Sequence, residues 1–159
     1  MLVQEGVLTH ISTGQDALEL LMKDHADVQA LFEEYEYLKE MDVDDDGRQQ
    51  AAEKIYRMLT VHAKIEEELV YPALRNSLDD GFLIDDAEIE HAVLEELIDQ
   101  LKGMDADEKL YDSKVKVLGE YVSQHVKEEE GDIFPQVRES GLDLVELGEQ
   151  VRARKEQLT

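Results

Sequence analysis

The sequence predicts an all-α protein, an up-down-up-down antiparallel four-helix bundle followed by an extra C-terminal helix. Apolar residues recur three and four positions apart along four long stretches, which is the period of an amphipathic helix. The breaks between these stretches are short, and short connections favour antiparallel neighbours. No stretch alternates for long with the period of two that a half-buried strand shows.

The first helix is expected over about residues 14–40. Ser12 or Thr13 is the expected N-cap, with Asp16 assisting in the first turn. A second helix is expected over about residues 48–70, after the acidic break at 41–47.

A third helix is expected over about residues 86–103, with Asp85 or Asp86 as its N-cap, and a fourth over about 108–134. Pro72 and Pro135, the only prolines of the chain, should kink or end the second and fourth helices.

A final helix is expected over about residues 142–157, after the Ser-Gly stop at 140–141. With 159 residues the chain is expected to form a single domain, 1–159, whose core bundle spans about 14–136.

Composition excludes several classes of function. The formal net charge is -24, from 40 acidic and 16 basic residues, so nucleic acid and anionic membranes are unexpected partners. The chain has no Cys, which excludes disulfides and thiolate metal ligands from it. The first residues show no signal peptide, and no apolar stretch is long enough to span a bilayer. The expected location is therefore the cytoplasm.

Four of the five histidines fall on apolar helix faces, in a duplicated pattern. Each half of the chain has a helix with one inward His, followed by a helix with His-x-x-x-Glu, a spacing that puts both side chains on one face. Burying these groups without a cation would cost many kcal/mol. The candidate metal ligands are His25, His62, Glu66, His91, His125 and Glu129.

Six inward ligands are too many for one tetrahedral zinc, and calcium or magnesium prefers oxygen ligands. Mixed imidazole and carboxylate ligands suit iron, manganese, cobalt or zinc. Two metals that share two carboxylates are the economical solution, because each metal then receives two imidazole nitrogens and one oxygen from each bridge. Positions remain for an oxo or hydroxo bridge and for an exogenous ligand.

This His, HxxxE, His, HxxxE order over about residues 14–136 resembles the hemerythrin-like family, also called the HHE cation-binding domain. The resemblance implies two non-heme iron ions inside the bundle. His25 and His62 would bind one iron and His91 and His125 the other, with bridges from the two glutamates of the HxxxE motifs. Ferritin-like di-iron sites use two Glu-x-x-His motifs, and here only Glu88–His91 fits.

One departure from the family concerns a fifth His, which oxygen-carrying hemerythrins have one turn from the third-helix His. Positions 88 and 95 are both Glu in this chain. The resemblance therefore implies the four-His, two-carboxylate branch, in which Glu95 or Glu88 is a candidate extra ligand. That branch is linked to peroxide decomposition, oxygen or nitric oxide sensing and iron–sulfur repair.

Several nearby residues are explained by ordinary structural roles. The acidic neighbours of the ligands are expected to face solvent; these are Asp24, Glu67, Glu68, Glu90, Glu128 and Glu130. Tyr121 and Tyr71 are expected in the core, and Tyr121 is the better candidate for a hydroxyl close to the metals. Residues 42–53 match the EF-hand calcium pattern, but ordinary turn chemistry explains the same residues, and an EF-hand would splay helices that the bundle keeps antiparallel.

The function expected from the sequence is a di-iron protein that binds or reacts with a small diatomic or peroxide ligand. Catalase-like peroxide decomposition is one reaction that the resemblance implies. The alternatives are a sensor or iron-handling module without turnover and a purely structural metal site.

Overall fold

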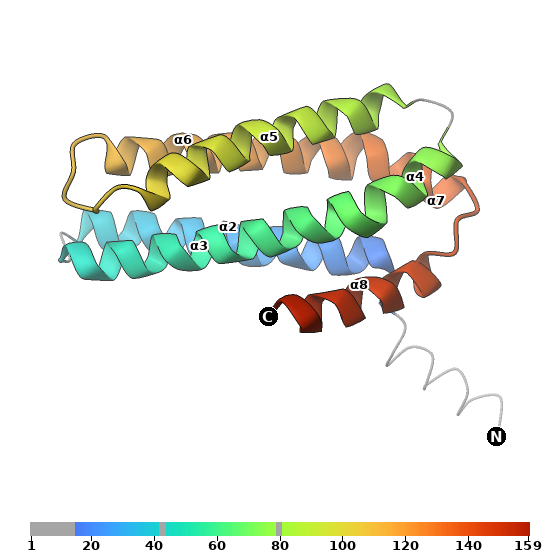
Figure 1. Ribbon diagram of the computed structural model, residues 1–159, viewed down its shortest axis with the longest axis horizontal. Helices are drawn as coiled ribbons and strands as arrows, with labels where there is room; N and C mark the ends of the chain where they lie inside the picture. Colours follow the sequence, from blue (N-terminus) through green and yellow to red (C-terminus); the bar gives the residue numbers. More distant parts are fainter. Residues whose placement is uncertain (1–14, 42–43, 79–80) are drawn as a thin grey trace, which may run out of the picture.

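The structure is a computed structural model that describes residues 15–41, 44–78 and 81–159. Four long helices lie along one another: α2 (Ala17–Glu40), α3 (Asp45–Ile65), α5 (Phe82–Lys102) and α6 (Tyr111–Glu128) (Figure 1). α8 (Leu144–Leu158) packs against α2. The described residues contain no strand, so the predicted fold class, a four-helix bundle with an added C-terminal helix, is confirmed. None of the described helices is long and apolar enough to cross a membrane.

α2 begins with a capping box. The Asp16 carboxylate accepts a hydrogen bond from the Glu19 backbone N–H at 2.9 Å, and the Glu19 side chain accepts from the Asp16 N–H at 3.2 Å. Asp16 is therefore the cap itself rather than an assisting residue. The predicted caps Ser12 and Thr13 lie outside the described residues.

α3 begins earlier than the sequence suggested. Asp44 caps it by accepting from the Gly47 backbone N–H at 2.9 Å, and residues 45–53 are already helical. A calcium loop over 42–53 requires these residues in a loop around the ion, so the described part of that stretch contradicts the EF-hand interpretation. Residues 42 and 43 lie outside the described residues.

The two prolines do not end their helices. Each follows a π-helical turn, η1 (Glu66–Val70) or η2 (Glu129–Ile133), and opens a short helix, α4 (Tyr71–Ser77) or α7 (Phe134–Glu139). A proline clashes with the carbonyl four residues earlier and donates no hydrogen bond. The wider π turn removes that conflict, so helical structure continues past each proline.

α5 also begins earlier than predicted, at Phe82, with Gly81 at its N-cap and no capping side chain. Asp85 and Asp86 are not caps. Asp85 instead accepts a hydrogen bond from Arg75 of α4 at 2.6 Å. At the start of α8, Asp143 is the cap and accepts from the Glu146 backbone N–H at 3.1 Å.

The core has two apolar parts, one at each end of the bundle. One contains Leu18, Leu21 and Leu74 with residues of α8, and the other contains Ile55 and Leu118 with their neighbours. The histidines of all four long helices lie between the two parts. The fold therefore places one polar layer between two hydrophobic ones, where water is largely excluded.

Candidate metal centre

The six candidate ligands meet in this polar layer, and all six are buried. Glu66 and Glu129 are 0% exposed, and the four histidines are between 5% and 8% exposed. Each of the four long helices carries one histidine, while η1 and η2 each begin at one of the glutamates. The His-x-x-x-Glu spacing places each glutamate one turn after its histidine, on the same inward face.

Their donor atoms form two overlapping groups in which all atoms lie within 4.8 Å of one another. Both groups include Glu66 and Glu129. One adds His25 and His62, and the other adds His91 and His125. Each group combines the two histidines of one half of the chain with the same two carboxylates.

Glu129 spans the centre. Its Oε1 lies 3.2 Å from His25 Nε2, and its Oε2 lies 3.2 Å from His125 Nε2. The Tyr71 hydroxyl donates a hydrogen bond to Glu129 Oε2 at 2.5 Å and lies 3.2 Å from His91 Nε2. One carboxylate thus contacts a histidine of each half of the chain.

Glu66 also contacts both halves. Its Oε1 lies 3.2 Å from His62 Nε2 and 3.1 Å from His91 Nε2. Several buried atoms of the centre have no hydrogen-bond partner among the described residues: His25 Nε2, His62 Nε2, Glu66 Oε2 and Glu129 Oε1. Unpaired buried polar atoms are costly, so their convergence on one point requires an explanation.

The outer nitrogen of every ligand histidine is held by a carboxylate. The four Nδ1 pairs are His25 with Glu130 at 2.6 Å, His62 with Asp24 at 2.9 Å, His91 with Glu67 at 3.0 Å and His125 with Glu90 at 2.7 Å. A carboxylate on Nδ1 fixes the ring and leaves Nε2 directed at the centre, which is the usual support of a metal-binding imidazole.

These four acids were expected to face solvent, and that is wrong for Asp24. Glu90 and Glu130 are half-buried, and Glu67 is exposed as expected although its carboxylate contacts His91. A residue next to an inward ligand lies on the flank of the helix, where the histidine of a neighbouring helix can reach it. Asp24 is even buried, at 5% exposed. Glu68 does lie at the surface, where it pairs with Arg154 of α8 at 3.0 Å.

The repeat itself carried the signal that was missed. In both halves an acid immediately precedes the first histidine, as Asp24 and Glu90, and another immediately follows the ligand glutamate, as Glu67 and Glu130. The preceding acid binds the second histidine of its own half, and the following acid binds the first histidine of the other half. Acids duplicated along with the ligands were therefore candidates for supporting them.

Tyr71 lies in the core as expected, and it rather than Tyr121 supplies the hydroxyl close to the centre. Tyr121 is 51% exposed and thus is not close to the centre, whereas Tyr71 is 1% exposed and donates into it. Phe134 occupies the equivalent position in the second half, and its ring stacks on His25 with centroids 6.1 Å apart. Only the first half therefore contributes a hydroxyl from this position.

The buried charges shift one another's pKa values. Burial alone would lower the pKa of His62, but Glu66 and Asp24 outweigh it and raise this pKa to about 10. Burial likewise opposes the charge of His125, whose pKa Glu129 and Glu66 raise to about 11. Burial would raise the pKa of Glu66, but His62 holds it well below its usual value. Cationic partners are thus strongly favoured beside both carboxylates.

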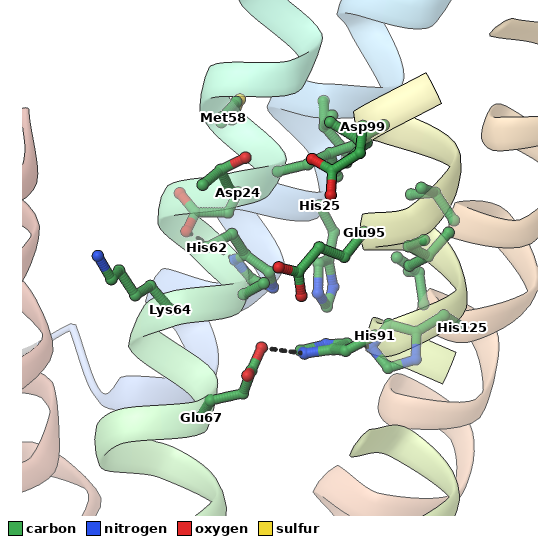
Figure 2. A pocket seen from close by; sticks show the side chains of 18 of the residues that line it. Asp24, His25, Met58, His62, Lys64, Glu67, His91, Glu95, Asp99 and His125 are labelled. Carbon is green, nitrogen blue, oxygen red and sulfur yellow. Dashed lines mark hydrogen bonds and ion pairs between the residues drawn. The ribbon is translucent and has the colours of Figure 1, made fainter. Parts of the chain in front are cut away.

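A cavity of about 320 Å³ reaches the histidines from the space between α3 and α5. Its walls include Leu59 and Leu94, and Glu95 lines it (Figure 2). Glu88, the other candidate extra ligand, is bound instead to Arg75 at 2.6 Å.

Comparison with known proteins agrees with this geometry. The hemerythrin HHE cation-binding domain family matches residues 16–137. A curated protein called DNA nickase, from Nostoc sp., is 30% identical over 122 residues. The match covers 76% of this chain but only 33% of that protein, so the chain spans about a third of the length of this relative.

One solved structure is similar to this chain over most of the length of both chains. It is the crystal structure of a hemerythrin HHE cation-binding domain-containing protein from Mycobacterium kansasii, with a TM-score of 0.75 and 26% identity. The likeness covers 91% of this chain and 87% of the other.

Proposed function

Because the chain belongs to the hemerythrin HHE cation-binding domain family, we propose that its buried centre holds two iron ions and binds or reacts with small oxidants. Oxygen, hydrogen peroxide and nitric oxide are the ligands in question. The observation that carries the proposal is the convergence of buried imidazole and carboxylate atoms, four of them without a hydrogen-bond partner, on one point between the helices.

The spacing of the donor atoms fits metal ions. Two ligand atoms each about 2.1 Å from one metal, at right angles, are about 3.0 Å apart. The contacts between donor atoms of the centre are 3.1 to 3.2 Å for five of its closest pairs. Imidazole nitrogen with carboxylate oxygen is a donor set that suits iron. The family description names a cation without naming the element.

In this proposal His25 and His62 hold one iron and His91 and His125 the other. Glu129 is placed to bridge, because its two oxygens face histidines of opposite halves. The second bridge would come from Glu66, whose Oε2 has no other partner.

Bound iron would supply open coordination positions and a change of oxidation state. The chain's own residues do the rest. The carboxylates on Nδ1 keep each ligand imidazole in one orientation. Tyr71 holds a proton on its hydroxyl beside Glu129, and burial together with Glu66 and Glu129 raises the pKa of that hydroxyl, so the proton stays there at neutral pH. The apolar walls of the cavity favour small, weakly hydrated ligands.

Peroxide decomposition is the reaction that would make the protein an enzyme, with two hydrogen peroxide molecules giving two waters and one dioxygen. A sensor or iron-handling module without turnover would use the same centre. The name of the Nostoc relative does not carry over on this evidence, because the match leaves two thirds of that protein uncovered and the net charge of -24 here repels DNA.

Metal analysis of protein purified without added metal, combined with its absorption spectrum, tests the proposal. We expect about two irons per chain and the near-ultraviolet absorption of an oxo-bridged pair. Zinc with a featureless spectrum, or a single iron, would overturn it. Oxygen release from added peroxide then separates an enzyme from a sensor.

A further inference from the structure

The cavity between α3 and α5 opens onto the candidate ligand histidines, and Glu95 is one of the carboxylates that line it. Glu95 comes from α5 and lies one turn after His91, so the two form a third His-x-x-x-Glu spacing. In Figure 2 its side chain extends from α5 into the space before the rings of His25 and His62. The spacing and the cavity both direct it toward the centre.

The Glu95 carboxylate is also free to move. It makes no hydrogen bond or ion pair with any residue that the structure describes, although it lies among charged side chains such as Lys64 and Asp99. The other acids around the histidines are all engaged: Asp24, Glu67, Glu90 and Glu130 hold Nδ1 atoms. Glu88 is bound to Arg75.

On the premise that the centre holds two irons, we propose that Glu95 is a seventh, exchangeable metal ligand. It binds the cavity side of the centre when no exogenous ligand is present, and it swings out when such a ligand enters. The first half of the chain has no counterpart, because Gln29 stands one turn after His25 and lines a different cavity.

Electrostatics makes both positions of Glu95 accessible. The Glu95 carboxylate is attracted to nearby cations, and because the side chain is exposed to solvent this attraction is moderate. In the structure the Glu95 side chain is exposed and hydrated, so a carboxylate that leaves the metal would lose little by desolvation. A ligand that is held by charge alone and has no hydrogen-bond partner is readily displaced.

Azide, a small anion that binds open iron positions, probes the exchange. The iron-loaded protein is titrated with azide and followed by its visible absorption, for the wild type and for Glu95→Gln and Glu95→Asp. Asp99→Asn is the matched control, since it removes one negative charge from the same cavity one turn further along α5. Iron content and the azide-free spectrum are recorded for each variant.

If Glu95 occupies the metal most of the time, its removal raises azide affinity about tenfold, because the ligand no longer competes. The spectrum without azide should also shift. Glu95→Asp is one methylene too short to reach, so it should behave like Glu95→Gln despite keeping its charge. Asp99→Asn should shift azide affinity much less and leave the azide-free spectrum unchanged.

Two results would overturn the assignment. One is an unchanged azide-free spectrum in both Glu95 variants. The other is a pattern of azide affinities that follows charge alone. In that pattern Glu95→Asp binds azide like the wild type, while Glu95→Gln and Asp99→Asn gain azide affinity equally. These results are distinct from failure of the proposed function, because that failure appears in the wild type as the absence of two irons.

Discussion

The two halves of the bundle, residues 17–77 and 82–139, repeat the same ligands but differ in what surrounds them. Asp24 on His62 is buried and also bound by Lys155 of α8, whereas Glu90 on His125 is half-buried. Tyr71 in the first half corresponds to Phe134 in the second.

The burial of Asp24 follows from α8, which packs against the first half; no other described helix packs on the second half in this way. Gly148 of α8 permits the close approach, because a Cβ there would lie 2.9 Å from the backbone oxygen of Gln15. A duplicated set of ligands can therefore give two metal positions that differ, because the supporting residues were not duplicated equally.

The largest effect is expected from removing either of the two glutamates that both halves share. Glu66→Ala and Glu129→Ala should each lose most of both irons and the near-ultraviolet band, because each carboxylate contacts histidines of both halves. His25→Ala should retain about half of the iron or more, since it disturbs one position. Iron content per chain is the measurement, and His10→Ala, outside the repeat, is the control. Two retained irons in both glutamate variants would rule out the bridges.

The next test compares equivalent supporting acids of the two halves. Asp24→Asn should weaken metal binding by about 10- to 100-fold, because its buried carboxylate holds His62 and also pairs with Lys155 of α8. Glu90→Gln should cost less, about tenfold or below, because that side chain is 32% exposed and water can replace it. Competition with a metal chelator measures both. Equal losses would mean that α8 does not distinguish the two halves.

The two halves should share the same pH dependence of folding stability. Without metal, the pKa values of His62 and His125 are about 10 and about 11, above the unfolded value of about 6.5. Their pairing with the carboxylates therefore stabilises the metal-free fold fully below about pH 6.5 and is lost as the pH rises through 10. Chemical denaturation of metal-free protein should show this decline, and it should be absent in metal-loaded protein.

The same protons compete with metal, so apparent metal affinity should keep rising above pH 7 rather than levelling near 6.5. A plateau from pH 7 upward would show that these imidazoles are already neutral there.

The smallest effect is expected from removing the Tyr71 hydroxyl. Tyr71→Phe leaves Glu129 without its donor and should lower the free energy of unfolding by about 1.5–3 kcal/mol in metal-free protein. Metal content should change little, because the ligands remain. Phe134→Tyr supplies the hydroxyl beside His25 instead, and it serves as the reciprocal variant. Unchanged stability in Tyr71→Phe would show that Glu129 finds another hydrogen-bond donor when the hydroxyl is removed.

Much of the molecule follows from local patterns in the sequence. The four amphipathic periods determine the bundle, because an apolar helix face must be buried against another. The six buried ligands were identifiable because polar residues on such faces are costly unless they are partnered, and they recurred in the same order twice. Helix starts were less predictable: α5 begins without a capping side chain, so no residue marks its first turn.

By itself, then, the sequence determined the fold class and the inward ligand set, since both depend on spacing along single helices. Only the tertiary structure decided which acid supports which histidine, because those pairs join residues from different helices, up to 105 positions apart. It also placed Tyr71 rather than Tyr121 beside Glu129, and Glu95 rather than Glu88 in the cavity next to the histidines. Each of those choices depends on which helix lies opposite and on how a π turn rotates the residues after it, neither of which local spacing encodes.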